Sequence, residues 1–402
     1  MARKMKDSGI EWIGEIPEGW EVCRLKNIVA CHDELRKPIS ADKRENHLKL
    51  YDYYGASGVI DTIDDYNVDG TVLLIGEDGA NLKLRNLPLI YRASGKFWVN
   101  NHAHILIVNK KHSYDYVAYL LEAGDYSNYI TGSAQPKLSQ FNLMRFPVAI
   151  PNYTEQENIS FFIHRECSKI DSILSETRSS IEEYKKLKQA VITQAVTKGV
   201  RGEREMKNSG VEWISEIPAN WTVKRGKQLF SETNERSETG SEELLTVSHI
   251  TGVTPRSQKT VNMFMSESLV GYKICHNGDL AANTMWMWQG AIGVSKFHGV
   301  ISPSYNTYRQ KANDYYFEYL DYLLRIRPLI DAYTIHSTGI TLSRLRLYPD
   351  SFLSLYFIVP PITEQKEIAD FLDTKCTEID KLIAKKEQLV KELESYKKSL
   401  IY

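Results

Sequence analysis

The feature that most constrains this chain is a short motif that it carries twice. The sequence DSGIEWIGEIPEGW occupies residues 7–20, and NSGVEWISEIPANW occupies residues 208–221. A second pair has IPNYTEQENISFFI at residues 150–163 and VPPITEQKEIADFL at residues 359–372. The order of short motif, variable block and TEQ segment therefore runs through the chain twice. This period is far longer than the roughly 20 to 50 residues of solenoid repeats, so each unit is predicted to be a domain with an appended element.

Each TEQ segment opens a long helical pattern. Thr154 and Thr363 are the predicted N-caps, and the glutamates that follow them favour the positive end of a helix. No proline or glycine then appears before Gly199 in the first copy, and none appears in the rest of the second. Apolar residues recur in alternating steps of four and three, which is the heptad pattern of a coiled coil. The seam residues are Ile163, Cys167, Ile170, Leu174, Thr177, Ile181, Tyr184, Lys188, Val191 and Ala195 in the first copy, and Leu372, Cys376, Ile379, Ile383, Lys386, Val390, Leu393, Lys397 and Leu400 in the second.

These two seams predict that the helices pack on each other. Polar residues interrupt both seams at equivalent positions, Thr177 with Lys386 and Lys188 with Lys397, and polar breaks can fix the register of a coiled coil. A helix over residues 155–198 would be about 66 Å long. One turn of DNA advances only about 34–36 Å. A stiff helix of this length could therefore hold two domains at a fixed separation along a duplex.

The short motif is predicted to form a helical turn. Ser8 with Glu11, and Ser209 with Glu212, have the S-x-x-E spacing of a capping box, and Pro17 stops the turn. A turn this short is not stable alone, so it must dock on another part of the protein. Packing against its own domain is the favoured interpretation. The alternative is a clasp that ties each unit to a long helix or to another subunit.

Composition narrows the class of protein. Of the 402 residues, 42% are hydrophobic, which predicts two or more packed, soluble domains. The 50 Lys and Arg nearly balance the 51 Asp and Glu, so a polyanion would be met by local patches or with help from another protein. No apolar stretch suits a signal peptide or a membrane span, so a cytoplasmic protein without a membrane partner is predicted.

The cysteines indicate a reducing compartment. Five occur, and none belongs to a CxxC pair, so neither a disulfide framework nor a zinc ribbon is favoured. Cys167 and Cys376 lie at core positions of the two seams. Packing is therefore the favoured interpretation of both, rather than redox or metal chemistry.

The variable blocks, near residues 30–147 and 231–358, mix short strands and helices. Runs such as GTVLLIG at residues 70–76 and HILIV at residues 104–108 predict strands. Helical patterns stand late in each block, in YDYVAYLLEAG and YYFEYLDYLLRI. One fold with two diverged surfaces is therefore predicted.

Polar loops follow those helices, at residues 131–145 and 337–352. They are rich in side chains that reach the phosphates and base edges of nucleic acids, although simple solvent exposure accounts for them equally well. Arginine can pair bidentately with guanine, glutamine can pair with adenine, and lysine can meet a phosphate. The candidate DNA-contacting residues of the two loops are Gln135, Lys137, Gln140, Arg145, Thr341, Arg344 and Arg346.

Two further segments add weaker candidates for DNA contact. GEDGANLKLR, residues 76–85, predicts a turn that leads to Lys83 and Arg85, which could contact a DNA backbone. MWMWQG, residues 285–290, contains Trp286 and Trp288, and either could stack on bases. Alternating large residues more often mark a core, which is the competing interpretation.

Motifs for catalysis or metal binding are weak or missing. His102 and His104 could ligate a metal from one face of a strand, but no carboxylate or cysteine stands near them in sequence, so strand packing is favoured. The chain has no GxxxxGK[ST] loop, no GxGxxG, no GxSxG and no [DN]PP[YF] motif of an amino-methyltransferase. The chain is therefore predicted not to be an enzyme, and to hold no metal or cofactor.

Several segments together closely resemble the specificity subunit of type I restriction–modification systems. They are SGIEWIGEIPEGWEVCRLKNI and its second copy, YYGASGVIDTIDDY, GEDGANL, FWVNNHAHIL, TGSAQPKLS, WQGAIGVSKFHGVISPSYNTYR and the paired TEQ helices. The resemblance covers essentially the whole chain. Recognition domains vary within this family, so the resemblance assigns no role to the individual loop residues.

The resemblance implies an α+β fold with a pseudo-two-fold internal repeat. Two mixed α/β target-recognition domains would be separated by two long antiparallel helices that form a coiled coil. The expected parts are residues 1–149 for the N-terminal recognition domain, 150–205 for the first long helix and linker, 206–358 for the C-terminal recognition domain, and 359–402 for the second long helix. Each domain would read one half of a split double-stranded DNA sequence.

The resemblance also implies partner subunits that perform the chemistry. Two methyltransferase subunits would bind S-adenosylmethionine and methylate adenine. Restriction subunits would use ATP and Mg²⁺ for translocation and cleavage. A competing hypothesis from another class is a coiled-coil adaptor that joins protein partners without touching DNA.

Overall fold

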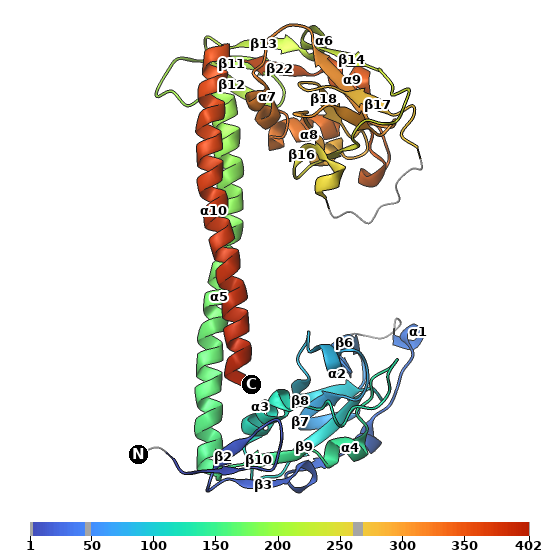
Figure 1. The fold of residues 1–402 in the computed structure, drawn as a ribbon, viewed down its shortest axis with the longest axis vertical. Helices are drawn as coiled ribbons and strands as arrows, with labels where there is room; N and C mark the ends of the chain where they lie inside the picture. The colour runs from blue at the N-terminus through green and yellow to red at the C-terminus, as the bar shows by residue number, and fades with distance from the viewer. Residues whose placement is uncertain (1–2, 45–49, 260–267, 402) are drawn as a thin grey trace. The chain divides into compact units, whose positions relative to one another are not determined.

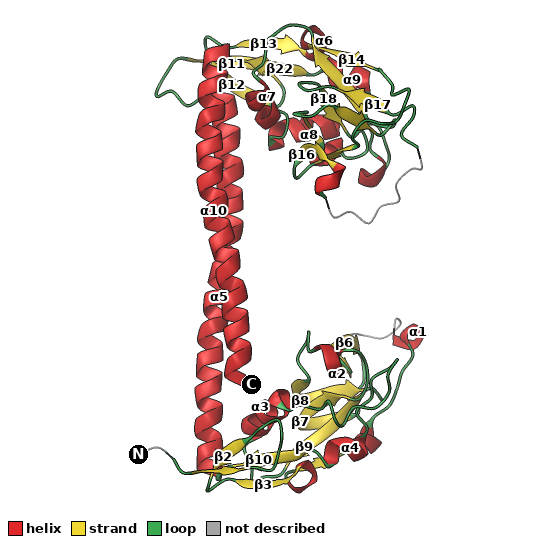
Figure 2. Cartoon of the chain, viewed as in Figure 1, coloured by secondary structure: helices red, strands yellow, loops and turns green. Residues whose placement is uncertain are grey.

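The computed structural model describes residues 3–44, 50–259 and 268–401. They form two compact units, each a mixture of helix and strand (Figure 2). The first unit runs to Glu176 and includes the chain from Leu389 onward, and the second unit runs from Thr177 to Gln388. Both long helices are thus divided between the units. None of the helices in the described ranges is long and apolar enough to cross a membrane.

The core of the first unit is a six-stranded sheet. Only the contact between β5 and β8 is parallel, and the other neighbours are antiparallel. The runs that predict strands at residues 70–76 and 104–108 lie in β7 and β9, which confirms that prediction. In spatial order the strands are β4 (Val29–Cys31), β9 (Ala103–Val108), β7 (Val68–Gly76), β8 (Ile90–Val99), β5 (Tyr51–Gly55) and β6 (Gly58–Ile63).

Apolar side chains fill both faces of this sheet. On one face Leu73 and Leu106 pack with Val117 and Leu121 of α3 (Tyr114–Ala123), the helix predicted from YDYVAYLLEAG. Leu74 packs with a separate cluster on the other face, because neighbouring residues of a strand point to opposite sides. The remaining helical elements of this unit are η1 (Leu25–Asn27), η2 (Asp33–Leu35), α1 (Ala41–Arg44), α2 (Asn81–Leu84) and α4 (Gln140–Met144).

The second unit has a smaller sheet and more helix. Its strands are β14 (Phe230–Thr233), β21 (Asn306–Gln310), β18 (Leu280–Ala282) and β19 (Ile292–Val294) in one sheet, the hairpin β15 (Leu245–Ser248) and β16 (Gly252–Pro255), and the pair β17 (Lys273–Cys275) and β20 (Gly299–Ile301). Its helical elements are α6 (Gly226–Leu229), η3 (Arg256–Gln258), η4 (Met287–Gln289), α7 (Phe317–Leu323), α8 (Arg327–Ile335), η5 (Leu342–Arg344) and α9 (Pro349–Ser354). The helix predicted from YYFEYLDYLLRI is α7.

In both units the chain enters and leaves the domain through a pair of neighbouring antiparallel strands. In the first unit β3 (Glu21–Arg24) pairs with β10 (Pro147–Ile150), and Arg24 stands opposite Pro147. In the second unit β13 (Thr222–Arg225) pairs with β22 (Tyr356–Val359) in the same manner. Each variable block is therefore closed at its base by a two-stranded neck.

The short motif forms a β-hairpin in both units, so the predicted helical turn is wrong. β1 (Met5–Asp7) pairs with β2 (Glu15–Pro17), and β11 (Met206–Val211) pairs with β12 (Ile214–Pro218). The Ser8 hydroxyl oxygen accepts a hydrogen bond from the N–H of Ile10 at 3.0 Å, two residues on, instead of capping a helix. Gly9 then takes the left-handed conformation with φ of 67°, which ends any helical path.

Each hairpin motif is also clasped to the start of a long helix. Arg3 pairs with Glu155 in the first unit, and Arg204 pairs with Glu364 in the second. Trp221 adds a hydrogen bond from its Nε1 to Glu364 Oε2 at 3.0 Å. The motif packs on its own domain as well, since the Trp12 ring stacks on Phe146 at a centroid distance of 5.6 Å. Both interpretations offered by the sequence therefore hold.

The long helices are α5 (Tyr153–Lys198, 46 residues) and α10 (Ile362–Ile401, 40 residues), and they lie side by side within each unit (Figure 1). Cys167 and Cys376 are buried, as the heptad pattern predicts. Both helices begin earlier than predicted, so Thr154 and Thr363 are not the N-caps. Asn152 has that role in the first copy, because its Oδ1 accepts from the N–H of Glu155 at 3.0 Å.

The two helices are antiparallel, and seam lysines pair across them. In the second unit Lys188 contacts Asp380 at 2.7 Å. In the first unit Lys397 contacts Asp171 at 2.5 Å. Lys397 and Asp171 are the repeat equivalents of Lys188 and Asp380, with residues 209 positions apart in each case. The breaks at Lys188 and Lys397 thus form reciprocal ion pairs, which supports their predicted role in fixing register. Within the described part of the chain the other two breaks form no such pair: Thr177 is buried, and Lys386 lies over the ring of Tyr184.

The glutamine of each TEQ segment anchors its helix to the domain. Gln365 is fully buried; its Nε2 donates to the carbonyls of Pro360 and Asp314, and its Oε1 accepts from the N–H of Tyr316 at 2.8 Å. Gln156 likewise donates to the carbonyl of Pro151 and accepts from the N–H of Ser113. The sequence shows the repeated TEQ, but the carbonyls and N–H groups that it satisfies come from distant segments.

Candidate nucleic-acid interface

The two predicted polar loops close in the same way, which confirms that they are equivalent. In the first unit Thr131 and Lys137 exchange backbone hydrogen bonds, both at 2.8 Å. In the second unit Thr338 and Arg346 do so at 3.0 and 2.9 Å. Each loop starts with Thr-Gly, so residues 131–137 and 338–346 are named the Thr-Gly loops. Closure at the base fixes each loop and presents its middle residues to solvent.

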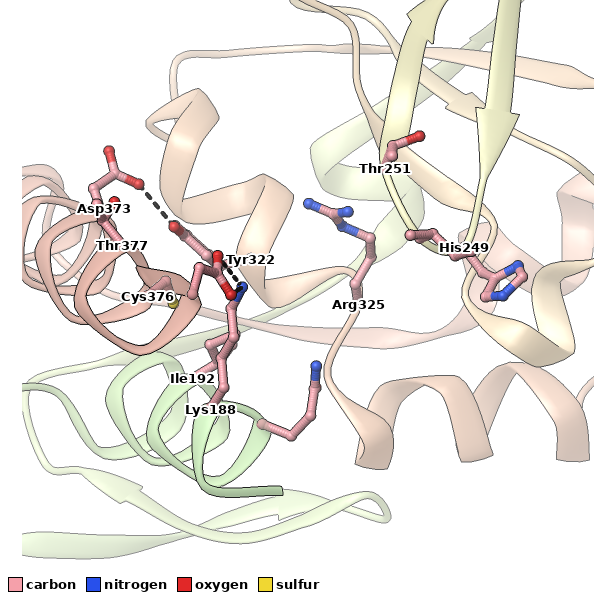
Figure 3. Close-up of a pocket in the computed structure, with 12 residues that line it drawn as sticks. Lys188, Ile192, His249, Thr251, Tyr322, Arg325, Asp373, Cys376 and Thr377 are labelled. Carbon is pink, nitrogen blue, oxygen red and sulfur yellow. Dashed lines mark hydrogen bonds and ion pairs between the residues drawn. The ribbon is translucent and has the colours of Figure 1, made fainter. Parts of the chain in front are cut away.

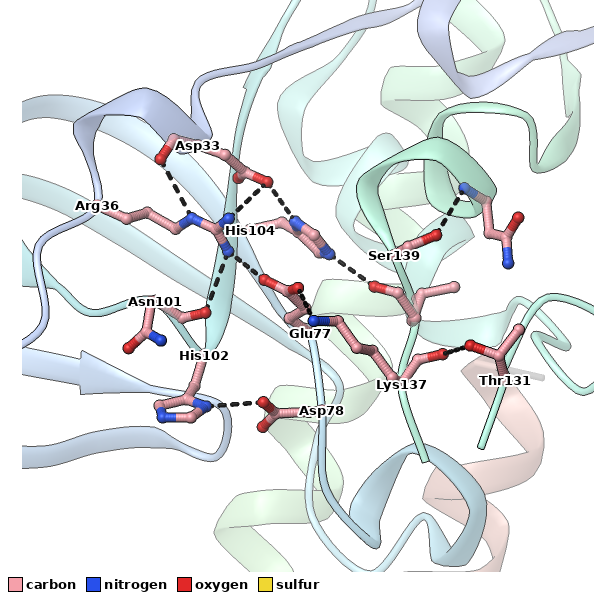
Figure 4. Close-up of polar contacts among 12 residues, drawn as sticks. Asp33, Arg36, Glu77, Asp78, Asn101, His102, His104, Thr131, Lys137 and Ser139 are labelled. Atoms are coloured by element: carbon pink, nitrogen blue, oxygen red, sulfur yellow. Dashed lines mark hydrogen bonds and ion pairs between the residues drawn. The ribbon is translucent and has the colours of Figure 1, made fainter. Parts of the chain in front are cut away.

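A polar network holds the first Thr-Gly loop against the sheet (Figure 4). Lys137 Nζ lies 3.0 Å from Glu77 Oε1, and the same carboxylate pairs with Arg36. Burial raises the pKa of Glu77, but hydrogen bonds from Arg36 and Lys137 outweigh that effect, and the net pKa is lowered. Glu77 therefore remains a carboxylate at neutral pH and keeps Lys137 in place.

His104 holds the residue that follows this loop, Leu138, in place. It is completely buried on β9; its Nδ1 lies 2.6 Å from Asp33 Oδ2, and its Nε2 lies 2.8 Å from the carbonyl oxygen of Leu138. The prediction of strand packing is confirmed for His104. The expectation of no carboxylate near the histidines is wrong, because η2 brings Asp33 to His104 and the end of β7 brings Asp78 to His102 at 2.7 Å. Both contacts join segments distant in sequence.

Among the residues that the structure describes, Cys31, Asp33 and His104 place potential metal-ligand atoms within 4.8 Å of one another. These groups are engaged with each other and with Arg36, whose guanidinium lies 3.1 Å from Asp33. Burial, followed by the charge of Asp33, raises the pKa of Cys31 to about 12. The Cys31 thiol is therefore protonated at neutral pH, and the ion pair with Arg36 and the contact with His104 hold Asp33 in place.

This raised pKa predicts an unreactive cysteine. At pH 9 only about one Cys31 in a thousand would be a thiolate in the folded chain, against about half in the unfolded chain. Alkylation by iodoacetamide at pH 9 is therefore expected to be about a hundredfold or more slower at Cys31 in buffer than in urea. Peptide mass spectrometry over time measures both rates. Equal rates in the two conditions would contradict the structural assignment.

Several predicted DNA-contacting residues of the first unit are exposed, and another points into the protein. Gln135, Lys83, Gln140 and Arg145 are exposed. Arg85 instead turns inward, and its guanidinium donates to the carbonyl oxygens of Glu122 and Gly124 at the end of α3. The turn before α2 lies against the Thr-Gly loop, because the N–H of Gly79 donates to the carbonyl of Pro136 at 3.0 Å. That turn and the loop thus form one surface.

In the second unit, Thr341 and Arg344 are exposed, whereas Arg346 is half-buried and donates to the carbonyl of Leu345. Ile340, at the tip of this Thr-Gly loop, is 98% exposed, and Leu342 is also exposed. The polar residues of this loop do not reveal the exposed Ile340. The sequence feature that marks it is an isolated apolar residue between Gly339 and Thr341 in an otherwise polar loop.

Of the two tryptophans of MWMWQG, Trp288 lies on η4 and Trp286 immediately precedes it. Trp286 is 45% exposed and Trp288 is half-buried, while Met287 occupies the core between them. The competing interpretation, in which these large residues belong to the core, is therefore wrong for Trp286. The two indoles stack at a centroid distance of 5.8 Å and an interplanar angle of 18°, and His249 stacks on Trp286 at 6.5 Å and 11°. Nothing in the sequence connected His249 with these rings.

A pocket of about 490 Å³ joins these parts of the second unit. Trp288 and Leu342 both line it, so the structure brings the tryptophan segment and the Thr-Gly loop together. The other lining residues are His249, Gln289, Arg327, Asp331 and Thr334. Arg327 and Asp331 belong to α8, which sequence reasoning did not single out.

A larger cleft of about 700 Å³ lies between the long helices and the β15–β16 turn of the second unit (Figure 3). Charged residues line it, but they are paired within the protein. Lys188 contacts Asp380, Arg325 contacts Asp321, and the Tyr322 hydroxyl donates to Asp373 at 2.7 Å. This cleft is therefore a weaker candidate for binding phosphate than the exposed loops.

Comparisons with known proteins agree with this architecture. A family model described as the type I restriction modification DNA specificity domain matches residues 17–183. A putative type I restriction enzyme specificity subunit of Haemophilus influenzae, S.HindORF215P, is 24% identical over 351 residues, which cover 87% of this chain and 85% of that protein. The putative MjaX specificity subunit of Methanocaldococcus jannaschii is 26% identical over 238 residues, 52% of each chain.

Solved structures share the fold. A chain from work on the complex assembly and conformational transition of the type I R-M system aligns with a TM-score of 0.67, at 13% identity, over 96% of this chain and 97% of that one. The HsdS subunit of Thermoanaerobacter tengcongensis aligns with a TM-score of 0.53, at 12% identity, over 96% of both chains. The family model matches the first copy, and the second copy repeats its hairpin motif, neck and TEQ helix. Residues 17–183 therefore match the type I restriction modification DNA specificity domain, and the chain as a whole is similar to specificity subunits of type I restriction–modification systems.

Proposed function

We propose that this chain is the DNA sequence-recognition subunit of a type I restriction–modification complex, and that each domain reads one half of a two-part target. The observation that carries this proposal is the pair of Thr-Gly loops, closed alike but bearing different side chains. A common frame with different loop residues suits two different half-sites. The match to the DNA specificity domain and the similarity to specificity subunits support the same conclusion.

The reading residues proposed here follow the chemistry of the loops. In the first unit Gln135 has an amide suited to adenine, and Lys137 is suited to a phosphate. In the second unit Arg344 is suited to guanine and Thr341 to a phosphate or a base edge. Lys83, Gln140 and Arg145 add exposed polar groups in the first unit. Arg85 is the weakest candidate because its guanidinium already caps α3.

The proposal assigns spacing and partner binding to the long helices. An uninterrupted α-helix of 46 residues is about 69 Å long, so the pair can set the number of unread base pairs between half-sites. Three exposed apolar residues recur at equivalent positions of the two helices: Phe162 with Phe371, Ile173 with Leu382, and Leu187 with Tyr396. Exposed apolar groups that repeat in this way favour two equivalent docking surfaces, one for each of two methyltransferase subunits.

In this proposal the catalytic steps belong to partner subunits. The methyltransferase subunits would bind S-adenosylmethionine, and restriction subunits would use ATP and Mg²⁺. The present chain would contribute position: it holds the DNA so that one adenine in each half-site faces a methyltransferase. Its near-neutral charge of −1 predicts weak DNA binding alone and stronger binding once the partners close around the duplex.

Modified-base sequencing of cells that express the complex tests the proposal. The expected result is a methylated motif of two specific parts separated by a fixed number of unread bases. A continuous motif, or no motif that depends on this chain, would refute it. Binding of the assembled complex to DNA should also weaken steeply as salt rises, since phosphate contacts release counterions.

The docking surfaces give a second prediction. Replacing Phe371 with aspartate is expected to weaken binding of one methyltransferase subunit about tenfold or more, because burial of a phenylalanine contributes about 1.5–3 kcal/mol. The double variant Phe162→Asp and Phe371→Asp should weaken both. Native mass spectrometry measures how many subunits remain bound. Val59→Asp, at an exposed apolar residue of β6, is the control, and loss of binding in that variant would contradict the assignment to the helices.

A further inference from the structure

Three aromatic rings form an exposed stack in the second unit. The Trp286 ring is nearly parallel to the rings of both His249 and Trp288, with interplanar angles of 11° and 18°. A flat base can stack on the free face of an aromatic ring, because stacking is favourable for any π-face. His249 and Trp288 line the pocket of about 490 Å³, so Trp288 is the indole that a ring in this pocket would meet.

This platform is built rigidly. Gly290 ends η4 in the left-handed conformation with φ of 83°, and a Cβ there would lie 2.6 Å from Cδ1 of Ile330 on α8. The Trp288 Nε1 donates to the carbonyl of Met285 at 3.1 Å, which fixes its indole. The rings are therefore held against the helix that carries Arg327 and Asp331. A preformed platform lowers the entropic cost of ordering side chains when a ligand binds.

The pocket beside the rings has polar groups that match the edge of a nucleobase. Gln289 can donate and accept, Arg327 donates, and Asp331 accepts. Arg327 and Asp331 pair with each other at 2.8 Å, but both are exposed, and such surface pairs contribute little stability. They can therefore turn to a ligand at small cost. The volume of about 490 Å³ leaves room for a planar heterocycle with its sugar.

Exposed apolar side chains neighbour the lining residues of this pocket in sequence. Leu342 lines it, Ile340 is at the loop tip two residues earlier, and Ile250 follows His249 on the β15–β16 turn; all three are exposed. Exposed apolar groups are unfavourable in water unless a partner covers them. In DNA-binding proteins such side chains enter base steps and partly unstack them. Ile340, the most exposed of the three, has the chemistry to fill the space that a displaced base leaves.

We infer that this pocket receives one nucleobase that leaves the base stack of the target DNA, with Trp288 as its stacking partner and Ile340, on the same Thr-Gly loop as the lining residue Leu342, as the residue that replaces it in the duplex. The inference rests on the proposed function and adds a mode of reading to it. It applies to one half-site only. The corresponding GEDGANL segment of the first unit has no aromatic residue, and its Glu77 is engaged with Arg36 and Lys137.

The test uses the complex of this chain with its methyltransferase subunits and duplexes that carry its mapped target. Mismatches are introduced one position at a time across both half-sites, and binding is measured by fluorescence anisotropy. A base that leaves the stack costs less to extract from a mismatch. The methyltransferases extrude the two adenines that they methylate, so mismatches at those two positions tighten binding in any case. Apart from them, one position in the half-site read by the second unit is expected to bind about tenfold tighter when mismatched, while mismatches at the remaining positions weaken binding.

The variant Trp288→Ala links that position to the pocket. It is expected to bind the matched target about tenfold more weakly. An abasic substitution at that position weakens binding by the wild type and should have no effect on the variant. Phe317→Ala, which removes an exposed ring of the same unit that does not line the pocket, is the control and should behave as wild type. Circular dichroism confirms that both variants are folded.

The outcomes separate the inference from the proposed function. Specific two-part binding in which no mismatch outside the methylated adenines tightens binding, or in which Trp288→Ala binds as wild type, overturns the inference alone. Absence of sequence-specific binding by the wild-type complex overturns the proposed function. A free mononucleotide gives a further test. If it quenches tryptophan fluorescence as strongly as the duplex does, the pocket binds a small nucleotide, and the inference is overturned.

Discussion

Replacing Glu364 with alanine is expected to destabilise the second unit by about 3–5 kcal/mol, the range for removal of one partner from a buried ion pair. Glu364 is completely buried, pairs with Arg204 and accepts a hydrogen bond from Trp221. Its loss leaves a largely buried guanidinium without its carboxylate and an indole N–H without an acceptor. It also detaches the hairpin motif from the start of α10.

Urea unfolding followed by circular dichroism and tryptophan fluorescence measures this loss. Glu155→Ala is the matched control, because Glu155 has the same place in the first copy but pairs with Arg3, whose side chain is 65% exposed. Exposed pairs contribute about 0–1 kcal/mol, so the control should lose little. Glu364→Gln should lie between the two, since an amide oxygen can still accept from Trp221. Equal losses for both alanine variants would show that burial of the pair is not what matters.

Exchanging residues 25–146 for the corresponding block of another family member is expected to replace one half of the recognised motif completely and to leave the other half unchanged. The neck makes the exchange feasible. Arg24 and Pro147 stand opposite each other on β3 and β10, and the N–H of Leu25 donates to the carbonyl of Phe146 at 2.9 Å. The block thus begins and ends at one point, and few contacts of the frame need to change.

Modified-base sequencing of cells with the exchanged chain measures the result. The matched exchange in the second unit runs between Arg225 and Tyr356, which face each other on β13 and β22. It should replace the other half-motif. The gap should remain constant in both cases because α5 and α10 are untouched. A change in both halves, or in the gap, would mean that reading and spacing are not separate properties of domains and helices.

The errors in the sequence predictions have local causes. The S-x-x-E spacing of Ser8 and Glu11 is a valid capping signal, but Gly9 and Gly14 both take left-handed conformations that a hairpin turn uses and a helix does not. Thr154 is a good N-cap residue, yet Asn152 caps the helix two residues earlier. In both cases two competing local signals were present. Contacts with the rest of the domain determined which one prevailed.

The candidate interface was only partly predictable. The Thr-Gly loops could be found because each follows a recognisable helix and is polar. Their exposed residues, among them Gln135 and Arg344, are where the sequence suggested. His249 and Arg327 could not be found, because they lie far from Trp288 in sequence and reach it only after β15 and α8 are packed. Arg85 shows the converse: a basic residue near a turn proved to cap a neighbouring helix.

The sequence by itself determined that the chain is a duplication with two long pairing helices. Internal repeats and heptad spacing are periodic signals, and a helix is built from contacts three and four residues apart, so the information is local. Only the tertiary structure decided which polar groups are satisfied inside the protein and which remain free to meet a ligand. Gln365, Glu364 and His104 have partners dozens to hundreds of residues away. Such partners are chosen when apolar faces bury against each other, and no local pattern of residues records that choice.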